Sequence, residues 1–187
     1  KSSVLVDLFS KGIHRTAIVD NSDNLISVVS QSNIAQLLAE NISRGDNKIA
    51  GERKISELGL GSIKPVSVQE DESVINTLTK IDANGFTAVA VTNSEGKLCG
   101  NFSSSDLRGL YKEHFPSLLK GVGDYLSETS PDSLKPTIMV GDPTLAEVAD
   151  QLVKEKLHRL WIVDADYKPT GVISLTDIMK IIKEFAY

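Results

Sequence analysis

The chain alternates short apolar runs with turn-forming residues, and this pattern recurs three times. Residues 14–20 and 158–164 both begin with His-Arg, continue into an apolar run and end in Asp. Residues 86–92 lie midway, so each run begins 72 residues after the one before it. This spacing is longer than the period of about 20 to 50 residues that is typical of solenoid repeats. The sequence therefore predicts three copies of a small module.

Each apolar run is predicted to begin a hairpin that a helix follows. Turn-forming residues separate the run from a second β-prone run, at residues 25–30, 98–103 and 171–174. A serine with Asn or Asp three residues later then stands where a helix needs an N-cap. Helical apolar stripes precede the hairpins and follow the first and third of them. The stripes are Val4, Leu5, Leu8, Phe9; Ile34, Leu37, Leu38; Val74, Ile75, Leu78, Ile81; Leu145, Val148, Ala149, Leu152, Val153; and Ile178, Ile181, Ile182, Phe185.

The predicted module is strand, helix, strand, strand, helix. It is complete in residues 65–111 and 137–187, whereas residues 1–42 form a partial copy without its first strand. Residues 43–64 and 112–136 are rich in Gly, Ser, Asp and Lys and are predicted to be linkers. The chain opens at Lys1, within a helical pattern, so we expect it to be a fragment.

Composition narrows the function classes. The 20 Lys and Arg against 25 Asp and Glu give a net charge of −5, which argues against a general affinity for nucleic acid or anionic membranes. No apolar run approaches the ~18 residues of a membrane span. The single cysteine, Cys99, excludes an internal disulfide and a Cys-based zinc site. Because no nucleophile stands with a placed base, we expect neither catalysis nor a metal or cofactor.

The module resembles the CBS domain, because a Ser-x-x-Asp pattern closes the hairpin at residues 103–106 and 174–177. The His-Arg pairs and the segment at residues 172–178 are similar to the γ subunit of the AMP-activated, Snf-type protein kinase. In that family four CBS repeats form a flat disc. The resemblance implies an α+β fold of tandem CBS repeats packed in pairs, with this chain as the second to fourth repeats.

The resemblance further implies an adenine nucleotide, AMP, ADP or ATP, held between paired repeats. An aspartate at a helix start can accept two hydrogen bonds from a ribose diol, and Arg, His and hydroxyl groups can donate to phosphate. The cleft between repeats two and three is the one expected to be built within this chain. The matching positions are Asp177, Ser174, Thr176, His158 and Arg159 in repeat three, Asp106 and Ser103 in repeat two, and His14 and Arg15 in repeat one.

Several positions depart from the family pattern. Asn33 replaces the aspartate of repeat one, and Ser32 stands where the family often has a phosphate-binding lysine. In repeat two, Gly85 is aligned with a basic residue. The aspartates also have a simpler interpretation as helix caps, and the His-Arg pairs as solvated helix ends. Trp161 is interpreted as core or interface packing.

Three functions follow as hypotheses. The first is a regulatory, energy-sensing subunit of the cytoplasm or nucleus that binds a nucleotide and modulates a kinase through its catalytic and beta-type subunits. The second is a CBS scaffold without nucleotide that regulates a kinase or phosphatase by docking. The third is the regulatory segment of a larger enzyme or transporter. In each case we expect self-association, a second chain or an upstream CBS repeat to cover residues 13–30, whose sheet face has no partner in this chain.

Overall fold

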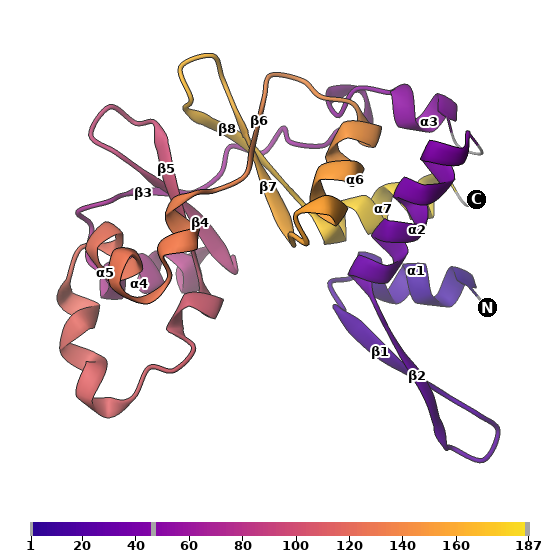
Figure 1. Cartoon of the computed structure of the whole chain (residues 1–187), viewed down its shortest axis with the longest axis horizontal. Coiled ribbons are helices and arrows are strands. Elements are labelled where there is room, and N and C mark those ends of the chain that lie inside the picture. The colour runs from indigo at the N-terminus through magenta and orange to yellow at the C-terminus, as the bar shows by residue number, and fades with distance from the viewer. Residues whose placement is uncertain (1, 46–47, 186–187) are drawn as a thin grey trace. The chain divides into compact units, whose positions relative to one another are not determined.

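The chain has a mixed α and β architecture, as the sequence predicts, in a computed structural model that describes residues 2–45 and 48–185 (Figure 1). The described residues divide into two compact units. Unit 1 lies within residues 1–62, 142–160 and 173–187, and unit 2 consists of residues 63–141 and 161–172. Unit 1 is therefore assembled from three separate stretches of the chain.

The three modules follow one another along the chain. Repeat one contains α1 (Ser2–Ser10), β1 (Arg15–Val19), β2 (Leu25–Ser30) and α2 (Gln31–Arg44), after which come α3 (Lys48–Glu52) and the 3-10 turn η1 (Ser56–Leu58). Repeat two contains β3 (Ser67–Gln69), α4 (Val74–Asn84), β4 (Ala88–Thr92), β5 (Leu98–Ser103) and η2 (Ser104–Leu107). Next come η3 (Lys112–Leu119), α5 (Val122–Thr129) and η4 (Pro131–Leu134). Repeat three contains β6 (Ile138–Val140), α6 (Leu145–Lys154), β7 (Arg159–Val163), β8 (Pro169–Ser174) and α7 (Leu175–Phe185).

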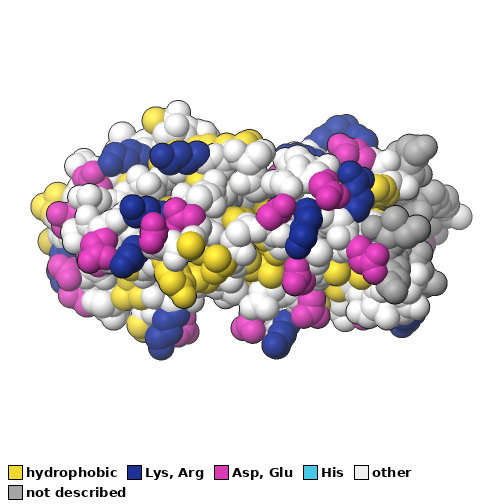
Figure 2. All heavy atoms as spheres, turned by 90° about the horizontal axis from the view of Figure 1, so that it is seen from above, with side chains coloured by type: hydrophobic (Ala, Val, Ile, Leu, Met, Phe, Trp, Pro, Cys, Tyr) yellow, Lys and Arg dark blue, Asp and Glu magenta, His cyan; other side chains and the backbone are white. Residues whose placement is uncertain are grey.

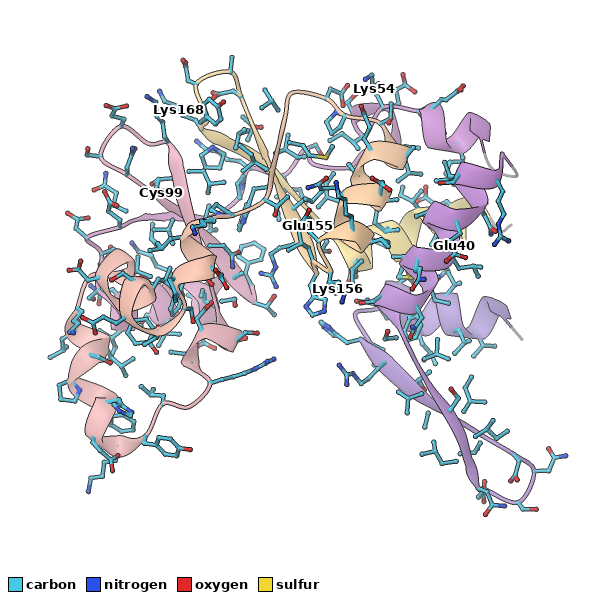
Figure 3. All side chains as sticks on the ribbon, in the orientation of Figure 1. Glu40, Lys54, Cys99, Glu155, Lys156 and Lys168 are labelled. Carbon is cyan, nitrogen blue, oxygen red and sulfur yellow. The ribbon has the colours of Figure 1, made fainter. Side chains whose placement is uncertain are left out.

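The three hairpins turn in the same way, which confirms the predicted repeat. In each turn one Asx side-chain oxygen accepts the backbone N–H groups two and four residues later. Such a bond pattern favours a tight turn. The groups are Asp20 with Ser22 and Asn24, Asn93 with Glu95 and Lys97, and Asp164 with Asp166 and Lys168, at 2.8–3.0 Å. Figure 3 shows Lys168 in the third turn.

These bonds correct the alignment of the middle copy by one residue. The first residue after each hairpin donates its backbone N–H to a carbonyl just before it, from Gln31 to His14, from Ser104 to Thr87 and from Leu175 to His158. The copies are therefore offset by 73 and then 71 residues, not twice by 72. Repeat two thus has Thr87 and Ala88 where the other repeats have His-Arg, and the comparison of Gly85 with a basic residue of the family stays a prediction. Within this chain, Gly85 corresponds to Gly12 and Lys156, which follow the preceding helices with positive φ.

Repeats one and three pack reciprocally within unit 1. Helix α1 lies against α7 and α2 lies against α6, so the first helix of each repeat meets the second helix of the other (Figure 1). The predicted stripe of α6 is buried at Leu145, Val148, Ala149 and Leu152, whereas Val153 is partly buried. In α1 and α2 two predicted core positions are exposed instead, Val4 at 60% and Leu37 at 51%. Val6, Gln31 and Ala35 are buried in these helices, because the seam with repeat three decides which face is covered.

An ion-pair cluster closes the seam between α1 and α7. The carboxylate of Asp7 contacts the ammonium groups of Lys11 at 2.7 Å and Lys183 at 2.5 Å. The hydrogen bonds from Lys11 and Lys183 lower the pKa of Asp7 to about 2. Since Asp7 titrates higher in the unfolded chain, its contribution to stability is complete above about pH 4 and is lost as the pH falls toward 2.

We expect Asp7→Asn to flatten the acid sensitivity of the α1–α7 seam. The variant carries no carboxylate at this position, so that contribution is absent at every pH and cannot be lost on acidification. Acid titration between pH 5 and 2, followed by far-ultraviolet circular dichroism, checks this against Asp82→Asn on the exposed part of α4. An Asp7→Asn curve that parallels the wild-type curve would contradict the assignment.

Unit 2 is built on the sheet β3-β4-β5, in which β3 and β4 are parallel and β4 and β5 antiparallel. Its core joins Val89, Val91 and Phe102 of the sheet to Val122 and Leu126 of α5. Residues 112–136, predicted to be a linker, therefore supply part of this core. The amide of Leu98 also donates to the carbonyl of Tyr167 at 2.9 Å, which joins β5 to the β7–β8 turn of repeat three.

The second helix expected in repeat two is not formed. The cap at Ser103 starts only the four-residue 3-10 turn η2, and Arg108 leaves helical geometry with ψ 130. Gly109 follows with a φ of +83, a conformation that ends a helix. The unit 2 core is completed by α5, whose Val122, Tyr125 and Leu126 are buried at i, i+3 and i+4.

The β1–β2 hairpin has an uncovered face and an open edge among the described residues. It forms a two-stranded sheet, whereas β4 and β7 each have a third, parallel strand at the positions equivalent to Ala17, Ile18 and Val19. Val19 is 48% exposed and Ile26 is 64% exposed. The positions equivalent to Val19, at Thr92 and Val163, are buried. Figure 1 shows the hairpin projecting away from α1 and α2.

We expect this 187-residue chain to self-associate through the hairpin face, and Ile26→Asp to weaken the association at least tenfold. Covering an apolar side chain such as Ile26 contributes about 1.5–3 kcal/mol, and a carboxylate there would lose its water instead. Sedimentation velocity over a concentration series measures the effect. Ile63→Asp is the matched control, because Ile63 is 73% exposed in unit 2. A wild-type chain that stays monomeric throughout the series would rule the association out.

Candidate functional site

The three predicted Ser-x-x-Asx pairs form the same local structure. In each, the backbone N–H and the hydroxyl of the serine both donate to one oxygen of the Asx side chain three residues later. The distances lie between 2.7 and 3.0 Å for Ser30 with Asn33, Ser103 with Asp106, and Ser174 with Asp177. This reciprocal cap holds each Asx side chain at the start of a helical turn. All three Asx side chains are thus helix caps. Whether one of them can also bind a ligand depends on whether its second side-chain atom is free.

Asp177 keeps a carboxylate oxygen toward solvent. Its Oδ2 accepts both bonds from Ser174, and its Oδ1 accepts one bond from Lys180 at 3.0 Å. The side chain is 29% exposed and that of Lys180 is 57% exposed. Burial raises the pKa of Asp177, but the bonds from Ser174 and the Lys180 ammonium outweigh it, so the pKa lies below its ordinary value. Asp177 is therefore ionised at neutral pH, with one oxygen opposed only by an exposed, movable side chain.

Asp106 is held differently. Its Oδ2 accepts the two bonds from Ser103, and its Oδ1 accepts a third, at 2.7 Å, from the hydroxyl of Ser133. Ser133 belongs to η4, which lies over Gly100 so closely that a Cβ there would stand 3.3 Å from Leu134. Asp106 is 9% exposed. The hydroxyl of Ser133 thus occupies the oxygen that a ribose hydroxyl would need.

The remaining predicted residues of repeats one and three lie in unit 1. His158 is exposed and Arg159 half-buried at the start of β7, and the carbonyl of His158 accepts the first amide of α7. His14 and Arg15 are both exposed at the equivalent place before β1. The structure therefore places one His-Arg pair directly beside the start of α7 and the other beside the start of α2.

The starts of α2 and α7 are joined by a residue that the sequence analysis did not identify. Gln31, 3% exposed, donates from Nε2 to the carbonyl of Phe9 and to the hydroxyl oxygen of Thr176, both at 2.9 Å. The position equivalent to Gln31 in repeat three is the buried Leu175. The sequence did contain a signal for Gln31, because this amide stands where repeat three has an apolar leucine. It contained no comparable signal for Ser133.

Other chemistry is limited. Among residues 2–45 and 48–185 no group of His, Cys, Asp or Glu side chains is arranged to hold a metal ion. Within the same residues no helix is long and apolar enough to cross a lipid bilayer.

Cys99, labelled in Figure 3, is half-buried rather than fully buried. Burial, and then the carboxylate of Glu70 at 3.8 Å, raise its pKa to about 11, so the thiol is unreactive at neutral pH. On the face in Figure 2, Lys and Arg side chains are interleaved with Asp and Glu.

Comparison with known proteins identifies the module. The CBS domain model matches residues 56–113 and 124–184. Protein sds23 of Neosartorya fischeri is 26% identical over 174 residues, which cover 85% of this chain and 32% of that protein. Protein SDS23 of Saccharomyces cerevisiae S288c is 28% identical over 193 residues, which cover 90% of this chain and 37% of that protein. The chain thus spans about a third of the length of these curated relatives.

Solved structures share the fold. Protein MJ1225 of Methanocaldococcus jannaschii, proposed to be an archaeal homologue of g-AMPK, superposes with a TM-score of 0.70 at 21% identity, covering 96% of this chain and 63% of that one. CBSX2, solved in complex with AMP, superposes with a TM-score of 0.55 at 21% identity, covering 72% of this chain and 98% of that one. Since the family match covers more than half of the sequence, and both the repeated hairpins and the superpositions agree with it, this chain belongs to the CBS domain family.

Proposed function

We propose that this chain is a non-catalytic regulatory module that binds an adenine nucleotide at the start of α7. The observation that carries the proposal is the partly exposed, ionised carboxylate of Asp177, which is fixed by Ser174 and stands in the first turn of a helix. Asp106 and Asn33, its equivalents, lack either the exposure or the charge. Repeat three is therefore the best candidate for a ligand site.

The groups around Asp177 suit the two ends of a nucleoside phosphate. A ribose hydroxyl can donate to Oδ1 of Asp177 once the exposed ammonium of Lys180 moves aside. The amides of Leu175 and Asp177 are already bonded, to the His158 carbonyl and the Ser174 hydroxyl, but the positive end of the helix dipole at the start of α7 favours an anion. Arg159 can offer two parallel donors to phosphate, and the hydroxyl of Thr176 can offer one. Ribose and phosphate groups are thus matched by separate side chains, from the start of β7 and the first turn of α7.

The regulatory part of the proposal concerns partners. CBSX2, which has this fold, was solved in complex with AMP, and MJ1225, which also has it, is itself a proposed homologue of g-AMPK. We propose that nucleotide occupancy changes how this chain binds a protein kinase through its catalytic and beta-type subunits. The placement of the ligand between repeats two and three and the location in the cytoplasm or nucleus stay predictions, as does the absence of catalysis.

Titration calorimetry with adenosine, AMP, ADP and ATP tests the binding. We expect at least one of the three nucleotides to bind with one site per chain. Arg159→Ala should weaken AMP more than adenosine, because its target is the phosphate. Failure of all four ligands to bind the folded wild-type chain would overturn the proposal.

A docking scaffold without nucleotide is the second candidate, and two observations favour it. The Ser133 hydroxyl already donates to Oδ1 of Asp106, and Asn33 gives repeat one no charged group at the equivalent position. The exposed face of the hairpin, including Val19 and Ile26, supplies an apolar surface for a partner. If kinase subunits co-purify equally with the wild-type chain and with Asp177→Ala, while no nucleotide binds, the scaffold is the better description.

A further inference from the structure

The buried amide of Gln31 connects three elements of unit 1. Its backbone N–H donates to the carbonyl of His14 at the start of β1. Its side-chain nitrogen donates to the carbonyl of Phe9 in α1 and to Oγ1 of Thr176 in α7, both at 2.9 Å. With 3% of its surface exposed, the side chain has no room to exchange these partners for water. Residues of repeat one therefore contact the first turn of a helix in repeat three directly.

The directions of these bonds determine where the proton of the Thr176 hydroxyl points. The carbonyl of Phe9 can only accept, so the amide group of Gln31 must turn its NH₂ toward Phe9. The second hydrogen of the same NH₂ reaches Oγ1 of Thr176, which must accept it. The hydroxyl proton of Thr176 is then directed away from Gln31 and is available to another acceptor. A hydroxyl oriented in this way needs no rearrangement before it donates to an anion.

We propose that Gln31 is a positioning residue for phosphate recognition, acting through Thr176; this rests on the proposed nucleotide site at the start of α7. Gln31 does not contact the ligand in this proposal. It fixes Thr176 as a donor toward the phosphate, so repeat one contributes to the affinity of a site formed by residues of repeat three. The ribose contact at Asp177 does not involve Gln31, which makes the effect specific to the phosphate.

The test compares AMP with adenosine by titration calorimetry on the 187-residue chain. Gln31→Met keeps the size of the side chain and removes its hydrogen bonds, and Thr176→Val removes the proposed donor. We expect each to weaken AMP about 10- to 100-fold, the effect of one hydrogen bond to a charged group, and to change adenosine less than twofold. Thr176→Ser should bind AMP as the wild type does. Gln36→Met is the matched control, since Gln36 is exposed on the same helix and bonds Glu40.

The double variant separates positioning from a general structural role. If Gln31 acts through Thr176, Gln31→Met with Thr176→Val should lose no more AMP affinity than either single variant. Losses that multiply, or equal losses for AMP and adenosine, would overturn the proposal.

Thermal unfolding establishes which variants are folded. If Gln31→Met does not fold, the pair Thr176→Val and Thr176→Ser decides, and wild-type AMP binding by Thr176→Val overturns the proposal. In that case the nucleotide site itself still stands. A wild-type chain that binds neither AMP nor adenosine overturns the nucleotide site and the role of Gln31 together.

Discussion

The Asp177→Ala chain is expected to bind its adenine nucleotide roughly 10- to 1000-fold more weakly than the wild type. The carboxylate can accept up to two hydrogen bonds from the ribose, each worth about 1.5–3 kcal/mol with a charged acceptor, less whatever water restores. Adenosine should lose as much affinity as AMP, because the contact is with ribose. Titration calorimetry with both ligands measures the change.

Lys180→Ala is the control for this variant. Lys180→Ala removes only the exposed partner of Asp177. An i,i+3 ion pair of this kind contributes a few tenths of a kcal/mol, so the nucleotide affinity of the variant should stay within about threefold of the wild-type affinity. Wild-type binding by Asp177→Ala would show that the carboxylate serves as a helix cap alone. The nucleotide would then have to be held elsewhere or not at all.

For Asp106→Ala we expect the opposite result, a loss of about 2–4 kcal/mol in the free energy of unfolding with unchanged nucleotide affinity. The substitution leaves the amide and hydroxyl of Ser103 and the hydroxyl of Ser133 without their charged acceptor in a buried place. Urea unfolding followed by the fluorescence of Trp161, the single tryptophan, reports on this part of the molecule, because Trp161 is buried in unit 2.

Two further variants make the Asp106 result specific. Ser133→Ala should account for about 1–2 kcal/mol of the loss, and the losses of the two variants should not add, because they share one hydrogen bond. Asp132→Ala, exposed in the same 3-10 turn, should change stability by less than about 0.5 kcal/mol. A stable Asp106→Ala chain that no longer binds nucleotide would mean that the ligand displaces Ser133.

Sequence patterns predicted the turns and helices that are determined by residues close together in the chain. The Asx residues after each apolar run form the turns, and the stripe from Leu145 to Leu152 faces the core. The cap at Ser103 misled, because Gly109 ends the helix that it seemed to begin. Helix α5 was missed although Val122, Tyr125 and Leu126 have helical spacing, since the Gly, Ser, Asp and Lys content of residues 112–136 favoured a linker.

The candidate site was predictable in its residues but not in their availability. A Ser-x-x-Asp pattern gives the same cap in repeats two and three, and only tertiary structure shows that the hydroxyl of Ser133 occupies the second oxygen of Asp106. Gln31 and Thr176 are 145 residues apart, so their contact has no local signature. Long-range polar contacts of this kind follow from the packing of repeat one against repeat three.

The reciprocal packing of α1 with α7 has a consequence for biosynthesis. Lys183 of α7 pairs with Asp7, so α1 can meet α7 only after the 176 residues that separate these two positions have been synthesised. At about 5–20 residues per second, the 125 residues between positions 62 and 187 take roughly 6 to 25 s to synthesise. The residues of unit 2 are made during that interval, while the apolar side of α1, including Phe9, has not yet met α7. Within these 187 residues, α1 is therefore the helix whose contact with its partner forms late in translation.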